Sequence, residues 1–64
     1  MTTLAIHLNN GKVVEKWHVM TYWLDEKYLN VRVPFGNASE TEMYDRKKII
    51  AIFEVYEDDK RRII

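Results

Sequence analysis

Alternation of apolar and polar side chains, interrupted by glycine-containing turns, is the feature that most limits what this sequence can fold into. Two of the alternating runs carry the apolar residues Leu4, Ile6 and Leu8, and Leu29, Val31, Val33 and Phe35. A period of two puts every second side chain on one face of a sheet, so such runs indicate β-strands. We therefore expect an all-β protein.

The first hairpin is predicted from the Asn-Gly pair at residues 10–11. Both residue types tolerate the positive φ that a two-residue type I′ turn requires. Such a turn would pair Leu8 with Val13 and Ile6 with Glu15. Because this register puts Glu15 among apolar neighbours, we expect it at a sheet edge or in a bulge.

A second hairpin follows a long bent strand. The apolar positions change parity at residues 19–21, which predicts a bulge of the kind that curls small sheets. After the next tight turn, pairing Leu24 with Leu29 also places Tyr22 opposite Val31 on the same face. The predicted core consists of Tyr22, Leu24, Leu29, Val31 and Phe53.

The segment after the second hairpin allows two assignments. Pro34 cannot donate a ladder hydrogen bond, so it marks a sheet edge or a strand end. We expect a short strand at residues 40–44 and a polar turn at residues 45–48. A one-turn helix is the alternative, because Ser39 and Glu42 have the spacing of a capping box.

The last predicted strand, residues 49–57, has apolar side chains on both faces. Residues 58–64 form a charged tail that we expect to fray unless its terminal isoleucines dock. These boundaries predict one β domain at residues 1–57, followed by the tail. We expect about four or five antiparallel strands in meander order, strongly curled, an arrangement that allows a small SH3-like or OB-like barrel.

The two-sided last strand and the short chain together predict self-association. A chain of 64 residues without cysteine buries little more apolar area than chain entropy requires, so a partner surface adds stability. We expect a homo-oligomer, in its simplest form a homodimer, that covers the second face through Ile50, Ile52 and Tyr56.

Charge and hydropathy exclude recognition by bulk electrostatics and membrane spanning. The ten basic and ten acidic residues cancel, which leaves no overall field for nucleic acid or an anionic membrane. The longest apolar run, residues 49–53, is far shorter than a bilayer span, and the first residues lack the pattern of a secretory signal. We expect a cytoplasmic protein that binds no membrane, and nucleic acid is not the favoured partner.

Catalysis, metal binding and cofactor binding all lack a suitable set of residues. The two histidines, His7 and His18, would lie about 13 Å apart in the predicted register, too far to share one zinc ion. Ser39 is the only serine, and no glycine elbow surrounds it. Carboxylates lie in polar stretches where nothing raises their pKa. We expect no catalytic residue, no metal site and no cofactor.

Three residues on one face of the second hairpin are the candidates for binding a partner: Trp23, Tyr28 and Arg32. Arg32 is placed to stack on the Trp23 ring, and this group has the composition of binding hot spots. The alternative is that a curled sheet buries Trp23 in a second small core. Stacking of a single-stranded nucleic acid on the same face is a further alternative.

The pattern of strands and turns resembles a group of known proteins. It is carried by the opening segment 4–15, the central segment Tyr28-Leu29-Asn30-Val31 and the closing segment 49–55. These are similar to small uncharacterised β-rich proteins of phages and prophages of Gram-positive bacteria. The resemblance implies an accessory protein that binds a host or defence factor in the host cytoplasm. We therefore expect a non-enzymatic protein-binding module, with a small-barrel nucleic-acid-binding protein as the alternative.

Overall fold

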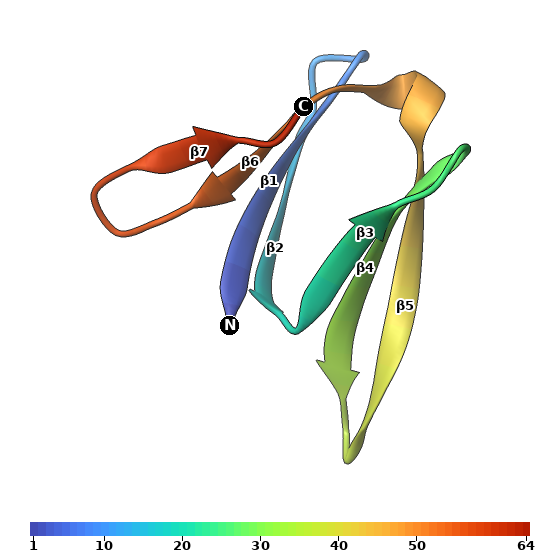
Figure 1. The fold of residues 1–64 in the computed structure, drawn as a ribbon, viewed down its shortest axis with the longest axis vertical. Helices are drawn as coiled ribbons and strands as arrows, with labels where there is room; N and C mark the ends of the chain where they lie inside the picture. The colour runs from blue at the N-terminus through green and yellow to red at the C-terminus, as the bar shows by residue number, and fades with distance from the viewer.

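The computed structural model describes residues 1–64, and its regular structure is almost entirely β (Figure 1). Its strands are β1 (Thr2–Leu8), β2 (Val13–Val19), β3 (Thr21–Leu24), β4 (Tyr28–Phe35), β5 (Ala38–Asp45), β6 (Ile49–Val55) and β7 (Lys60–Arg62). One short 3-10 turn, η1 (Arg46–Lys48), joins β5 to β6. The prediction of an all-β protein is confirmed.

The strands form two antiparallel sheets. The first sheet has the order β2-β1-β6-β7 and the second β3-β4-β5 (Figure 1). Meander order therefore holds only in the second sheet, and the prediction of four or five strands in one meander is wrong. The reason is long-range: β6 inserts beside β1, which places Ile52 opposite Ile6. Neither sheet closes on itself, so the structure does not confirm a barrel.

The first hairpin forms, but with a longer loop than predicted. Residues 9–11 make a three-residue loop whose glycine has a φ of +87°, the combination of a type I turn and a left-handed residue. The extra loop residue shifts the register by one, so Ile6 pairs with Val14 and Glu15 pairs with Ala5. The predicted register is therefore wrong. In the observed register Val14 faces the core beside Ile6, and Glu15 points to the outer face beside Ala5.

The predicted bend between the hairpins has two parts. The register of β1 with β2 shifts near His18, which has a φ of +60°. Strand β2 then ends at Val19 and β3 begins at Thr21, so the chain changes sheet at Met20. The fully buried Val19 side chain anchors this corner in the core.

The second hairpin has the predicted register. Tyr22 pairs with Val31, and Leu24 pairs with Leu29. Strand β5 continues the sheet along the whole of β4, after a two-residue turn at 36–37. It is longer than the predicted strand at residues 40–44, and the predicted polar turn at residues 45–48 contains the short η1, capped by Asp45. Ser39 and Glu42 lie in β5, so they do not cap a helix.

One hydrophobic core joins the two sheets. Its buried side chains are Leu4, Ile6, Val19, Leu29, Val31, Val33 and Ile52. Tyr22 and Leu24 are half-buried against this core. The prediction of a buried core position for Phe53 is wrong, because its pairing with Ala5 puts it on the outer face of the first sheet, half-buried.

The charged C-terminal segment is part of the first sheet. Strand β7 pairs with the end of β6. The Ile63 amide donates to the Ile52 carbonyl oxygen at 2.7 Å, and the Ile63 side chain packs against the core. We expected the tail to fray unless its terminal isoleucines dock, and Ile63 does dock.

Candidate binding surface

The outer face of the second sheet carries all three predicted partner-binding residues. The Arg32 guanidinium carbon lies 5.7 Å from the centre of the Trp23 ring, the predicted cation–π geometry. Trp23 is 42% exposed, so it is not part of a second core. Tyr28 lies on the same side of β4 as Arg32, four pairs away in the ladder, and is diagonal to Met43. The second hairpin thus assembles the group that its alternation predicted.

Met43 enlarges this group, and sequence reasoning missed it. Residue Asn30 pairs with Trp23 on one side and with Met43 on the other, so the three side chains form one row across β3, β4 and β5. Met43 is largely exposed. The signal available in the sequence was its parity within the predicted strand at residues 40–44. We call Trp23, Tyr28, Arg32 and Met43 the aromatic surface.

A buried amide supports the centre of the aromatic surface. Asn30 is only 4% exposed although it lies on the outer face, because Trp23 and Met43 flank it. Its Nδ2 donates to Asp25 Oδ2 at 2.9 Å and to the Trp23 carbonyl oxygen at 3.4 Å. A buried amide with these partners fixes the strand ends around it.

The turn before β4 holds Tyr28 in place. Asp25 Oδ1 accepts hydrogen bonds from the amides of Lys27 at 2.8 Å and Tyr28 at 2.7 Å. The hydrogen bond from Asn30 lowers the pKa of Asp25, and these amides add to the effect. Arg46 Nη1 also donates to the Asp25 carbonyl oxygen at 2.6 Å, which ties the turn to the end of β5. The aromatic surface therefore rests on a preformed turn.

The residues predicted to mediate self-association do not form one patch. Ile52 is fully buried in the core, because the register of β6 shifts at Ile50 and turns Ile52 inward. Ile50 is 61% exposed, and Tyr56 is about half exposed with its hydroxyl donating to Glu54 at 2.6 Å. The assignment of Ile52 to an interface is corrected to the core, and self-association stays a prediction that rests on Ile50 and Tyr56.

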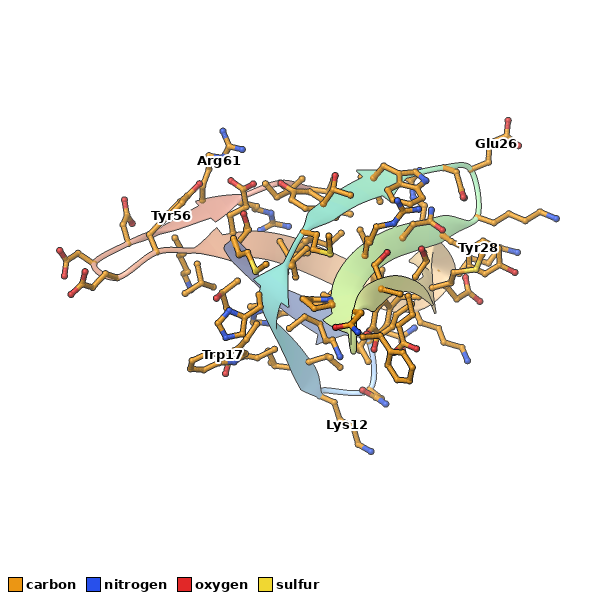
Figure 2. All side chains as sticks on the ribbon, turned by 90° about the horizontal axis from the view of Figure 1, so that it is seen from below. Lys12, Trp17, Glu26, Tyr28, Tyr56 and Arg61 are labelled. Atoms are coloured by element: carbon orange, nitrogen blue, oxygen red, sulfur yellow. The ribbon has the colours of Figure 1, made fainter.

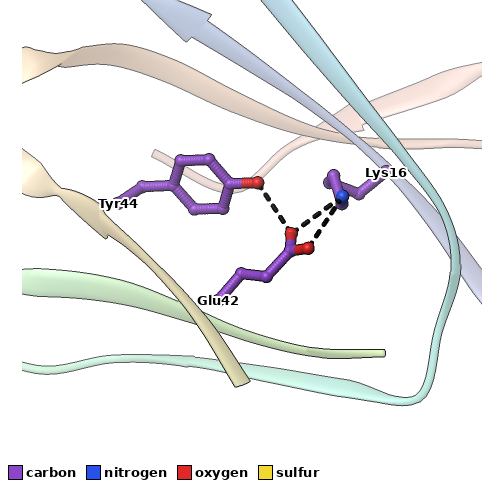
Figure 3. A network of polar contacts seen from close by, with 3 residues as sticks. All are labelled: Lys16, Glu42 and Tyr44. Atoms are coloured by element: carbon purple, nitrogen blue, oxygen red, sulfur yellow. Dashed lines mark hydrogen bonds and ion pairs between the residues drawn. The ribbon is translucent and has the colours of Figure 1, made fainter. Parts of the chain in front are cut away.

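A first carboxylate network links edge strand β5 to the first sheet (Figure 3). Lys16 Nζ lies 2.8 Å from Glu42 Oε1 and 3.1 Å from its Oε2. The Tyr44 hydroxyl donates to Glu42 Oε1 at 2.9 Å. The hydrogen bond from Lys16 lowers the pKa of Glu42, while burial raises the pKa of Tyr44.

A second network links the other edge strand, β3, to the first sheet. The Tyr22 hydroxyl donates to Glu54 Oε2, and Arg61 Nη2 lies 2.8 Å from Glu54 Oε1, which also accepts the hydrogen bond from Tyr56. Figure 2 shows Tyr56 and Arg61 at the same end of the molecule. The hydrogen bond from Tyr22 lowers the pKa of the buried Glu54, and burial raises that of Tyr22 to about 12.

These two carboxylates are poorly suited to acid–base catalysis. A general acid needs a raised pKa, whereas Glu42 and Glu54 both have a lowered pKa and their oxygens already accept hydrogen bonds. No group of three histidine, cysteine or acidic side chains is arranged to hold a metal ion. His7 instead packs edge-on against Phe53, with ring centres 5.1 Å apart.

Two clusters of basic residues occur in the chain, at residues 46–48 and 60–62, and four of their six side chains contact other groups of the protein. Lys60 Nζ and the Arg62 guanidinium carbon lie 4.7 and 5.8 Å from the centre of the Phe53 ring. Arg61 is bound to Glu54, and Arg46 to the turn at Asp25. None of the structure's helical segments has the length and apolar character needed to cross a bilayer.

No protein-family model, curated protein or solved structure matches this chain.

Proposed function

We propose that this protein is a non-enzymatic module that binds another protein through the aromatic surface. The observation that carries the proposal is the exposure of Trp23, Tyr28, Arg32 and Met43 side by side on a sheet face. Tryptophan, tyrosine, arginine and methionine are enriched in protein interfaces, and the first three dominate binding hot spots.

The support beneath the aromatic surface strengthens the proposal. The Asn30 amide and the Asp25 turn hold the backbone of this face by hydrogen bonds. A preformed surface loses less conformational entropy on binding than a mobile one. The face thus combines large contact residues with a rigid base.

The resemblance to small phage and prophage proteins supplies the biological setting of the proposal. In that setting the protein is an accessory factor in the host cytoplasm, and its partner is a host or defence protein. We also propose that the two sheets are halves of a small SH3-like barrel, since they share one core and the chain crosses between them at Met20.

The test compares two exposed tryptophans. Trp23→Ala combined with Arg32→Ala should abolish capture of the partner from an extract of the natural host, while far-ultraviolet circular dichroism still shows a folded β protein. Trp17→Ala is the matched control, because Trp17 is 64% exposed and lies far from Tyr28 (Figure 2). Loss of capture by the control alone would contradict the proposal.

The nucleic-acid alternative is tested with the same proteins. A nucleic-acid-binding barrel would bind single-stranded oligonucleotides tightly at low salt and lose affinity steeply as salt rises. We expect no measurable binding, because the ten basic and ten acidic residues cancel and leave no overall field that attracts phosphates. Binding at low salt that the double variant removes would favour the alternative over the proposed function.

A further inference from the structure

The four edge strands of the two sheets differ in how they are protected against pairing with another chain. Strand β2 has a register shift, β3 has only four residues, and β7 has three residues that are all basic. Short length, bulges and cationic side chains are the usual protections of sheet edges. Strand β5 has eight residues paired without a bulge to β4, and it contains no proline, lysine or arginine.

Hydrogen-bonding groups of β5 point away from the sheet at alternate residues. The Arg32 carbonyl oxygen accepts from the Met20 amide, which places the backbone groups of Arg32 on the β3 side. Opposed residues of an antiparallel ladder point their groups inward or outward together. Thr41 is opposite Arg32, so its amide and carbonyl face the free edge, and those of Ser39 and Met43 do likewise.

The side chains of β5 indicate which kind of strand can pair with its free edge. Glu40 is exposed and makes no ion pair, and Glu42 lies on the same face, two residues away. Lys16 of β2 pairs with Glu42, so Glu40 carries the uncompensated negative charge of this face. A second copy of β5 would bring glutamates against glutamates, which is destabilising across a strand pair. A strand with lysine or arginine at alternate positions is complementary.

The free edge adjoins the aromatic surface. Met43 belongs to both: it ends the row that begins at Trp23, and its backbone groups face the edge. A strand added beside β5 would place one of its side chains next to Met43 on the outer face. The edge and the aromatic surface thus form one continuous site.

We propose that β5 binds an extended segment of the partner by adding it as a fourth strand to the second sheet. The segment has a basic residue opposite Glu40, the glutamate without an ion pair, and an apolar residue opposite Met43. Backbone hydrogen bonds supply affinity and the alternating side chains supply specificity in such pairing. This inference rests on the proposed function and names the chemistry of the partner.

The probe is a synthetic peptide of about eight residues that alternates lysine and valine and is blocked at both ends. Its controls are an acidic twin that alternates glutamate and valine, and two copies of the basic peptide N-methylated on one or the other set of alternate amides. We expect the basic peptide to bind at least about tenfold more tightly than the acidic twin. Only one of the two N-methylated peptides should retain binding, because only every second amide of the peptide points toward β5.

Variants of β5 locate the site. Thr41→Pro removes an edge-facing amide and should abolish binding, whereas Thr41→Val keeps that amide and should not. Glu40→Lys should reverse the preference between the basic and acidic peptides. Binding is read from shifts of the Ser39 and Met43 amide signals in nuclear magnetic resonance spectra, and of the Thr41 amide signal in the proteins that keep this amide.

The possible outcomes separate this inference from the proposed function. Three results would each overturn it. The first is no binding of the basic peptide at millimolar concentration, and the second is a set of amide shifts confined to the first sheet. The third is concentration-dependent pairing of β5 with β7 of a second copy. If the peptide binds at β5 but the Trp23 and Arg32 double variant still captures the partner, strand addition at β5 is supported and the aromatic surface is not the binding site. Loss of capture in the Trp23 and Arg32 variant without any strand binding would do the reverse.

Discussion

The two sheets share one core but present different outer surfaces. In the middle of the first sheet, Ala5 and Ala51 are buried on the outer side, and Lys60 and Arg62 lie over the neighbouring Phe53 ring. The second sheet leaves its largest outer side chains open and ends in an unprotected strand. The C-terminal strand β7 thus covers one edge of the first sheet, whereas the outer face and the β5 edge of the second sheet stay open to a partner.

The difference follows from where each sheet obtains its last strand. Strand β7 brings three cations to the edge of the first sheet, and two of them stack on Phe53. Strand β5 reaches the edge of the second sheet with Glu40 and Glu42 and no cation. Because cations protect a sheet edge, the distribution of charge between β7 and β5 distinguishes the completed sheet from the open one.

The largest expected effect comes from the core that the two sheets share. Leu29→Ala should cost about 2–5 kcal/mol, because the buried leucine leaves a cavity, and a domain of this size has a total stability of about 3–10 kcal/mol. Phe53→Ala, on the outer face of the first sheet, should cost less. Urea unfolding followed by circular dichroism measures both, and a reversed order would show that the two positions are misassigned.

The next effect distinguishes the two networks that link the sheets. Glu54→Gln should cost about 1–3 kcal/mol, because it replaces the buried, charged acceptor of the Tyr22 hydroxyl with a neutral amide. Glu42→Gln should cost about 0–1 kcal/mol, because its pair with Lys16 is partly exposed and solvent screens it. Equal losses in the free energy of unfolding would contradict this ranking.

The Glu54 network also predicts a window of pH stability. Tyr22 has its pKa raised from 10.0 to about 12, so its contribution is complete below pH 10 and is lost as the pH rises through about 12. Glu54 has its pKa lowered from 4.5, so its contribution is complete above that pH and is lost as the pH falls through the lower folded value. Unfolding free energies measured from acid to alkaline pH test both limits.

A matched variant isolates the alkaline limit. Tyr22→Phe keeps the ring and removes the titrating hydroxyl, so the fall in stability between pH 10 and about 12 should shrink. An unchanged alkaline profile would exclude Tyr22 as its source.

The smallest effect on stability is expected at the exposed tryptophans. Trp23→Ala and Trp17→Ala should each cost less than about 1 kcal/mol, because both rings are exposed and a cation–π contact at a surface contributes little. Thermal melts of both variants test this expectation. A loss of several kcal/mol for Trp23→Ala alone would make this ring part of the core and remove it from the binding surface.

Local pattern was sufficient for the second hairpin and for three of the four residues of the aromatic surface. Its alternation is unbroken, so pairing Leu24 with Leu29 fixed the outward position of Trp23. The first hairpin differed because Asn-Gly fits loops of two lengths. The choice between them depends on tertiary burial, which favours Val14 over Glu15 opposite Ile6.

Long-range pairing explains what the sequence did not predict. Strand β6 is apolar on both faces, so its periodicity could not show whether Ile52 or Phe53 faces the core. The answer comes from its pairing with β1, more than 40 residues earlier in the chain. Met43 joined the candidate site through the ladder between β4 and β5, whose register no single strand pattern contains.

Hydrogen–deuterium exchange of the protein alone and bound to its captured partner tests most directly whether the second sheet is the recognition surface. We predict that the added protection is concentrated at the edge-facing amides of Ser39, Thr41 and Met43, because they gain hydrogen bonds in the complex. Amides of β1, β2 and β6 should exchange as in the free protein, apart from a uniform effect of stabilisation. Protection concentrated in β2 around Trp17, with β5 unchanged, would contradict the account.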